Sequence, residues 1–238
     1  MMELTDTRFL NPVWHALHGP HRHLAIGSGA ACRYPADVAP FAAMEAGSAA
    51  AQRQLHALLG VGESVWVAGT ADHPGLRVEQ ELDCVQMVLP RDAPPPVPAR
   101  VSAPVPAPVP DIVPLSGENA AEMVALTDVA FPGFFRPATH RMGSYVGIRM
   151  DGRLIAMAGE RLRLEGCPEL SGICTHPEHR GKGLAAGLIG RLVEAHRRAG
   201  LTSWLHVGAP NTRAIELYER LGFLRIRNLM LRRISRIG

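Results

Sequence analysis

The sequence lacks several features that define common classes of protein. It has only four cysteines, Cys32, Cys84, Cys167 and Cys174, and no two of them form a CxxC pair. Their spacing predicts neither a zinc site nor a disulfide framework, so a reducing compartment fits. The chain opens without a signal-peptide core, and no apolar run reaches the length of a membrane span. We therefore expect a cytoplasmic protein without a membrane partner.

A strong charge of either sign is also missing. The 238 residues carry 25 Lys and Arg against 22 Asp and Glu, which gives a formal net charge of +3. That excess is too small to indicate a nucleic-acid partner. Apolar residues make up 47% of the chain and charged residues 20%, a balance that favours a packed core. The length suits one large domain or two small ones.

Prolines are concentrated in one stretch, since residues 90–114 hold ten of the chain's 20. Such a composition favours extended backbone and resists both helix and sheet. We therefore predict an α/β region over residues 1–89, a Pro-rich linker over 90–114 and a second domain over 115–238. In the first region the apolar patterns predict strands near residues 21–27, 65–70 and 84–90 and a helix over 40–59.

The second domain has a clearer pattern. Ser116 is a good N-cap, Asp151-Gly152 is a strong hairpin signal, and Gly200 and Gly222 are typical helix terminators. The predicted elements are a helix over 116–130, strands over 144–150, 154–164 and 169–175, a helix over 184–200, a strand over 202–207, a helix over 211–222 and a strand over 223–234.

Residues 175–190, THPEHRGKGLAAGLIG, place basic side chains and glycines at the start of the predicted helix. This pattern indicates an anionic ligand, because a helix N-terminus offers free N–H groups and partial positive charge. A P-loop is excluded by the lack of GxxxxGK[ST]. A dinucleotide fingerprint matches formally at Gly181, Gly183 and Ala186. However, four residues separate the strand from these glycines, and the acidic residue expected about twenty positions later is missing.

The stretch instead resembles motif A of the GNAT-type N-acetyltransferase superfamily, [QR]xxGx[GA], which reads RGKGLA at residues 180–185. Two further segments strengthen the resemblance. SGICTHP occupies the place of the family's fourth strand, and NTRAIELYERLGF resembles its motif B. The three motifs occur in the family's order, and the resemblance covers about residues 110–238.

The resemblance implies an α/β fold with a mixed, mostly antiparallel sheet, a splayed central strand pair and flanking helices. The N-terminal region is open to interpretation as a degenerate copy of the same fold. Acetyl-CoA is the implied cosubstrate, and no metal is expected. The residues at positions that contact coenzyme A in the family are Ile173, Cys174, Thr175, Arg180, Gly181, Lys182, Gly183, Leu184, Ala185, Ala186 and Asn211.

The resemblance also implies catalytic roles. Tyr218 matches the usual general acid, and a backbone N–H of strand 169–175 would bind the oxyanion. Relatives often carry Glu on the fifth strand where this chain has His206, which is a plausible base near neutral pH. Glu169 and Glu160 are alternatives, as is the absence of a dedicated base. Cys174 is expected to contact the cofactor through its backbone rather than to be acetylated.

The leading expectation is therefore an N-acetyltransferase in which a primary amine attacks acetyl-CoA directly in a ternary complex. The amine would belong to a small molecule or a peptide. Two alternatives stay open: a noncatalytic acyl-CoA-binding module, and a transferase of longer acyl groups. A homodimer is also left open.

Overall fold

A single eight-stranded sheet forms the framework of the computed structural model, which describes residues 6–45, 48–69, 75–94 and 111–237. Its strands, in chain order, are β3 (Ser64–Ala68), β4 (Leu76–Val88), β5 (Ile112–Leu115), β6 (Tyr145–Met150), β7 (Arg153–Leu164), β8 (Cys167–Thr175), β9 (Trp204–Gly208) and β10 (Leu224–Arg236). They lie in the order β3-β10-β4-β9-β8-β7-β6-β5. All neighbours are antiparallel except β8 and β9, which run parallel.

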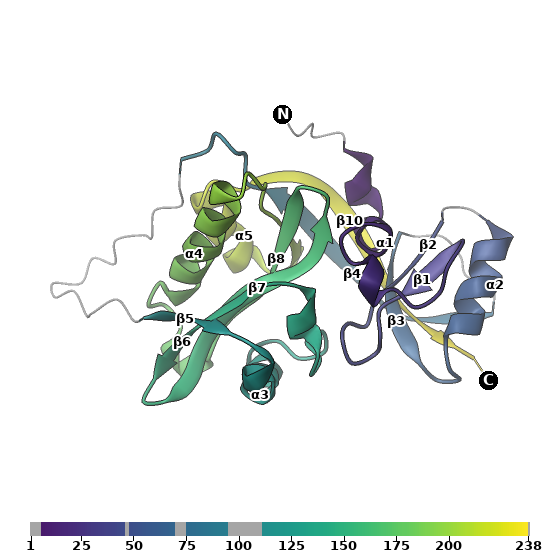
Figure 1. The fold of residues 1–238 in the computed structure, drawn as a ribbon, viewed down its shortest axis with the longest axis horizontal. Helices are drawn as coiled ribbons and strands as arrows, with labels where there is room; N and C mark the ends of the chain where they lie inside the picture. The colour runs from purple at the N-terminus through teal and green to yellow at the C-terminus, as the bar shows by residue number, and fades with distance from the viewer. Residues whose placement is uncertain (1–5, 46–47, 70–74, 95–110, 238) are drawn as a thin grey trace, which may run out of the picture.

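Helices flank this sheet, which confirms the predicted fold class (Figure 1). Their bounds are α1 (Pro12–His18), α2 (Ala49–Leu58), α3 (Ala120–Ala130), α4 (Leu184–Arg198) and α5 (Thr212–Arg220). A separate two-stranded sheet contains β1 (Ala31–Arg33) and β2 (Ala42–Met44).

Side-chain alternation divides the helices between the two faces of the sheet. Leu188 and Ile189 of α4 share a buried cluster with Ala156 and Ala158 of β7 and with Leu205 of β9. The odd-numbered Met157 points to the opposite face, where it packs with Met123 and Leu126 of α3. This is the period-two alternation expected of a strand buried on both faces.

Turn chemistry fixes the register of the β6–β7 hairpin. Asp151 and Gly152 both adopt positive φ, at 50° and 77°, as a two-residue turn of the primed type requires. Gly200 and Gly222 end α4 and α5 with φ of 69° and 91°, so both predicted helix terminators are confirmed.

The strands β4 and β10 join the two ends of the molecule. They pair over nearly their whole length, from the part that contains α4 and α5 to the part that contains β1, β2 and α2 (Figure 1). Because β4 also pairs with β9, strands from residues 1–89 continue the sheet formed by residues 115–238. The three-part division stays a prediction. Its linker includes residues 95–110, which lie outside the described residues, and β5 already begins at Ile112.

Two predicted elements of the first region are wrong. The segment predicted as a helix over residues 40–59 contains the strand β2 and only then the helix α2, which begins after its N-cap Ser48. Phe41, Ala42 and Ala43 are all buried, so this run has no polar face that a surface helix could expose. The predicted strand at 21–27 is a short 3₁₀ turn at Arg22–Leu24, followed by a single bridge from Ile26 to Arg33.

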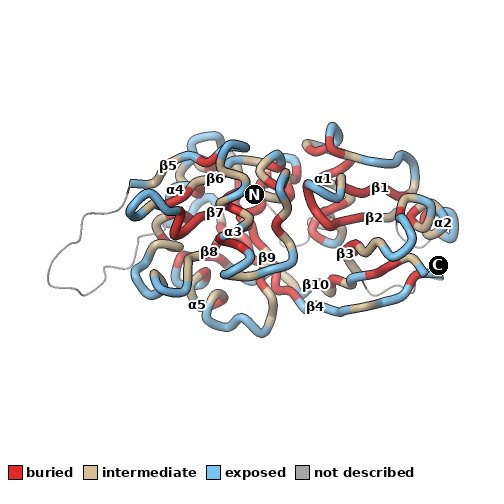
Figure 2. Tube along the Cα trace, turned by 90° about the horizontal axis from the view of Figure 1, so that it is seen from below, coloured by how far each residue is buried: buried red, intermediate tan, exposed pale blue. Residues whose placement is uncertain are grey.

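Burial follows the central strands, whereas the loops and the outer side of α2 are exposed (Figure 2). Among the described segments, no helix combines the length and the apolar character needed to cross a bilayer.

Candidate active site

The parallel pair β8 and β9 separates soon after it forms. Only Glu169 and Leu170 of β8 pair with β9, opposite Trp204 and Leu205. Beyond that point β8 stays with β7 up to Thr175, while β9 stays with β4. A gap therefore opens between residues 171–175 and 206–208, and it confirms the splayed central pair that the resemblance implies.

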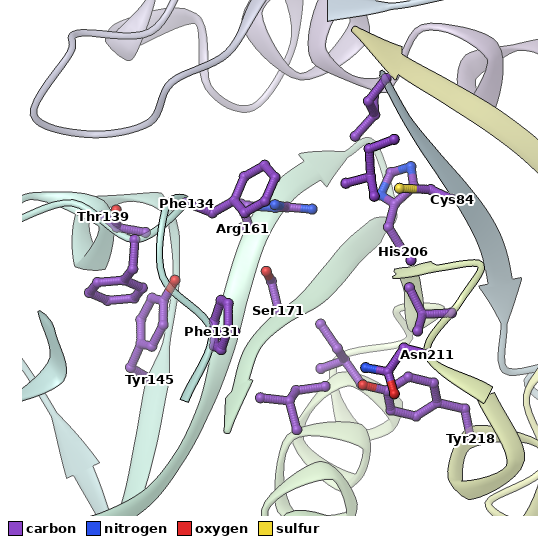
Figure 3. Close-up of a pocket in the computed structure, with 18 residues that line it drawn as sticks. Cys84, Phe131, Phe134, Thr139, Tyr145, Arg161, Ser171, His206, Asn211 and Tyr218 are labelled. Atoms are coloured by element: carbon purple, nitrogen blue, oxygen red, sulfur yellow. The ribbon is translucent and has the colours of Figure 1, made fainter. Parts of the chain in front are cut away.

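A cavity of about 220 Å³ lies at this gap (Figure 3). Its walls come from the two splayed strands, from strands β4, β6, β7 and β10, from α5 with its N-cap, and from the segment after α3. The lining residues are Leu82, Cys84, Phe131, Phe134, Phe135, Thr139, Tyr145, Arg161, Leu170, Ser171, Gly172, Ile173, His206, Val207, Gly208, Asn211, Tyr218 and Leu231.

A buried polar network closes the narrow end of the gap. The Glu169 carboxylate accepts from Nε of Arg161 at 3.0 Å, from Nη2 of Arg161 at 2.6 Å and from the Leu162 N–H at 3.0 Å. Nδ1 of His206 lies 2.7 Å from Oε1 of the same carboxylate. Burial would raise the pKa of Glu169, but Arg161 and His206 outweigh it and lower this pKa to about 2. Glu169 is thus an ionised anchor for both side chains.

The other ring nitrogen of His206 contacts Gln86 of β4. The Gln86 amide nitrogen lies 2.8 Å from Nε2 of His206 and donates to the Phe9 carbonyl at 2.9 Å. An amide NH₂ only donates, so Nε2 is the acceptor and Nδ1 carries the proton that points at Glu169. Gln86 and Glu169 therefore hold the imidazole from its two sides. Sequence reasoning missed this residue, although a glutamine inside an apolar strand pattern was a usable signal.

Glu160, the third base candidate, lies outside the cavity. Its carboxylate contacts Nε2 of His196 on α4 at 3.0 Å and Nη2 of Arg163 at 2.6 Å. Nδ1 of His196 in turn contacts the Ser203 hydroxyl at 2.8 Å. Even-numbered residues of β7 at this point face α4, whereas the cavity lies on the other face.

Tyr218 and Asn211 lie together on the opposite side of the cavity from the aromatic rings of Phe131, Phe134 and Tyr145 (Figure 3). Tyr218 points inward from α5 and is buried, which raises the pKa of its phenol to about 12. Its hydroxyl therefore keeps its proton throughout the neutral pH range. Asn211 caps α5, because its side chain accepts from the Ala214 N–H at 3.2 Å.

The residues predicted on β8 divide between the two sides of the strand. Ile173 lines the cavity, whereas Cys174 packs in the buried cluster beneath α3. Burial raises the pKa of the Cys174 thiol to about 12, so it is a poor nucleophile. Between Ser171 and Cys174 the pairing of β8 with β7 shifts register. The shifted segment contains Gly172, whose φ is +62°. This glycine bulge was not predicted, and a glycine inside a strand pattern was its only signal.

The glycine-rich turn forms the mouth of α4, at the outer end of the splayed strand β8. Gly181 and Gly183 both have positive φ, at 79° and 75°. Gly183 occupies the N-cap position, and among the described residues no side chain caps the helix. Arg180 donates from Nε to the Thr175 carbonyl at 3.3 Å, and Lys182 beside it is exposed. The first N–H groups of α4 are therefore available to an anion.

Three side chains near this mouth have the chemistry of metal ligands. His176, Glu178 and His179 bring one ligand atom each to within 4.8 Å of one another. Glu178 is largely exposed, and the group belongs to the turn that leads into the glycines. It lies outside the cavity, so we assign it no role in the chemistry below.

Comparisons with known proteins agree with this geometry. The acetyltransferase (GNAT) family model matches residues 118–223. The crystal structure of a protein from Novosphingobium aromaticivorans, named for the GNAT family, is 36% identical, covers 98% of this chain and 100% of that one, and has a TM-score of 0.84. The chain therefore belongs to the GNAT family of acetyltransferases, a family of enzymes whose cosubstrate is acetyl-CoA.

More distant relatives share the fold or a part of the sequence. A GCN5-related N-acetyltransferase from Kribbella flavida is 20% identical, with a TM-score of 0.57 over 94% of each chain, and shows the same fold. The ribosomal protein bS18-alanine N-acetyltransferase of Escherichia coli K12 is 35% identical over 77 residues, which are 32% of this chain and 51% of that protein. The chain thus spans about half the length of the curated relatives it matches.

The network at the narrow end of the gap gives a stability prediction. Glu169→Gln should lower the free energy of unfolding by about 3 kcal/mol at pH 7, because it leaves the buried Arg161 charge without its partner. The Glu169 pKa is lowered in the folded state, so the wild-type advantage is present above the ordinary Glu pKa and lost as pH falls towards 2. Urea unfolding at pH 7 and pH 3 measures both effects.

Glu194→Gln is the matched control, since Glu194 forms an exposed pair with Arg198 at 2.9 Å. It should change stability by no more than about 0.5 kcal/mol. Equal stability of the two variants at pH 7 would contradict the anchoring role of Glu169.

Proposed function

We propose that this protein transfers an acetyl group from acetyl-CoA to a primary amine, of a small molecule or a peptide, by direct attack in a ternary complex. One observation carries the proposal: the gap between β8 and β9 connects an uncapped helix mouth to a cavity that contains Tyr218 and His206. The Escherichia coli relative is named for an alanine of a ribosomal protein, which supports a peptide amine as one of the two acceptor classes.

The cofactor arm would lie along the unpaired edge of β8. Backbone groups of residues 173–175 would pair with the pantetheine as a neighbouring strand does. The diphosphate would bind over residues 180–186 and Asn211 would contact the arm from the start of α5. Arg180 and Lys182 add positive charge there, and glycines let the backbone approach the phosphates closely.

The proposed reaction begins with a neutral amine. Its nitrogen attacks the thioester carbon, and a backbone N–H of β8 near the Gly172 bulge stabilises the oxyanion. When the C–S bond breaks, the sulfur leaves as a thiolate and takes the phenolic proton of Tyr218. The proton lost by the amine nitrogen passes to Nε2 of His206, directly or through water.

His206 is the preferred proton acceptor because it lines the cavity and Glu169 holds it as the Nδ1–H tautomer. Proton uptake at Nε2 requires Gln86 to withdraw its N–H from that nitrogen. Oε1 of Gln86 is buried and makes no hydrogen bond to the described residues, so a turned amide would offer it to the imidazolium. Glu169 itself is a weaker base, since its pKa is about 2.

The helix mouth is tested by Gly183→Asp. An added carboxylate would repel the diphosphate, so affinity for acetyl-CoA should fall about tenfold or more. Isothermal titration calorimetry measures this affinity. Gly183→Asn has nearly the same shape without the charge and should retain more affinity than the Asp variant. Wild-type affinity in Gly183→Asp would rule out this diphosphate site.

The acid role is tested by Tyr218→Phe, which should reduce turnover about 10²-fold while acetyl-CoA affinity stays nearly unchanged. The lost hydroxyl acts on the leaving thiolate and not on the bound cofactor. Thiol release measures turnover, and calorimetry measures affinity. Tyr34→Phe is the control, because it removes a buried hydroxyl that contacts His21 outside the cavity. Full activity in Tyr218→Phe would remove the proposed role.

The base role is tested by pH profiles. An imidazole accepts a proton only in its neutral form, so activity should rise with pH. His206→Ala should abolish that rise, and His206→Glu should restore part of the activity by supplying the residue that relatives carry. His23→Ala, an exposed histidine outside the cavity, should leave the profile intact. An unchanged pH profile in His206→Ala would mean that Glu169 is the base or that no residue acts as a dedicated base.

A further inference from the structure

The cavity concentrates the chain's few aromatic residues. The sequence has six phenylalanines and three tyrosines. Three of those phenylalanines, Phe131, Phe134 and Phe135, and two of those tyrosines, Tyr145 and Tyr218, line this one cavity. Only Tyr218 is required by the proposed reaction. The other four rings form a wall on the acceptor side that the chemistry of acetyl transfer does not explain.

This aromatic wall is held rigidly by its neighbours. Phe134 stacks on Trp66 and Phe41, with ring centroids 5.1 and 6.0 Å apart. Phe135 meets Tyr145 edge to face at 5.7 Å. Trp66 and Phe41 come from the N-terminal region, so that region supports the acceptor side of the cavity. Phe131 and Phe134 are themselves only half-buried, which leaves ring surface open to a ligand.

The charges of the cavity are balanced without a ligand. Arg161 is the only Arg, Lys, Asp or Glu among the lining residues, and Glu169 neutralises it through two hydrogen bonds. A second positive charge on the acceptor would meet no counter-charge in the wall. An added carboxylate would meet an arginine whose charge Glu169 already compensates. Burying either charge here would be unfavourable.

We propose that the acceptor is a primary amine that carries an aromatic ring and no further charge near its amine. The ring would pack against Phe131, Phe134, Phe135 and Tyr145 and place the nitrogen towards Ser171 and the splayed strands. This inference rests on the proposed acetyl transfer. Two kinds of acceptor combine a primary amine with an aromatic ring: a small arylalkylamine, and a peptide whose first residue is aromatic.

The test compares acceptors that differ in one property. Phenethylamine supplies the ring, propylamine lacks it, 1,4-diaminobutane adds a positive charge and phenylalanine adds a carboxylate. A tripeptide amide with phenylalanine first represents the peptide source. Thiol release from acetyl-CoA gives kcat/KM for each. We expect phenethylamine or the peptide to exceed propylamine at least tenfold, as burial of a ring against aromatic side chains provides. The kcat/KM values of 1,4-diaminobutane and phenylalanine should fall below those of propylamine and phenethylamine.

Phe131→Ala should reduce the ratio of the phenethylamine kcat/KM to the propylamine kcat/KM several-fold. Val129→Ala is the control, because Val129 is 56% exposed, lies two residues away and does not line the cavity. The inference would be overturned by equal kcat/KM for propylamine and both ring-bearing acceptors in the wild type, or by a ratio that Phe131→Ala leaves unchanged.

A second readout separates this inference from the proposed function. If no amine releases thiol, the proposed acetyl transfer fails, and calorimetry of phenethylamine against the full chain decides the aromatic site by itself. Binding that Phe131→Ala weakens and Val129→Ala preserves supports the site. Absence of phenethylamine binding in that case overturns it.

Discussion

The structure depends on one incomplete strand pairing. Parallel strands β8 and β9 form only two residue pairs before they separate. Each then keeps its other neighbour, so the sheet stays continuous while a gap opens inside it. The unpaired backbone groups on the gap are left for water or a ligand to satisfy. At Gly172 the register between β7 and β8 also shifts. The proposed contacts with the pantetheine arm and the thioester lie along this gap.

The closed end of the gap is fixed by electrostatics. The Glu169 carboxylate has no exposed surface, and its charge is tolerable only because Arg161, the Leu162 N–H and His206 surround it. The same carboxylate orients the imidazole that we propose as the proton acceptor. Structural stability and proposed chemistry therefore depend on one buried anion, and a change at Glu169 would affect both.

The N-terminal region contributes to the site as well as to the fold. It supplies β4, whose Gln86 contacts His206 and whose Leu82 and Cys84 line the cavity. It also supplies Phe41 and Trp66, which support Phe134. The family model covers only residues 118–223, so these contributions lie outside the matched segment.

The sequence by itself determined the local elements of residues 116–234, since helix caps, the Asp151-Gly152 turn and the glycine terminators act within a few residues. In β9, Leu205 packs with α4 whereas the next residue, His206, lines the cavity, as strand alternation requires. The split of residues 40–59 into strand and helix was missed, because β2 forms only by pairing with β1. Tertiary structure alone decided which side of β7 carries Glu160, that Arg161 and four aromatic rings line one cavity, and that Gln86 contacts His206 beside it. Those groups come from segments far apart in the chain, and only their packing brings them together.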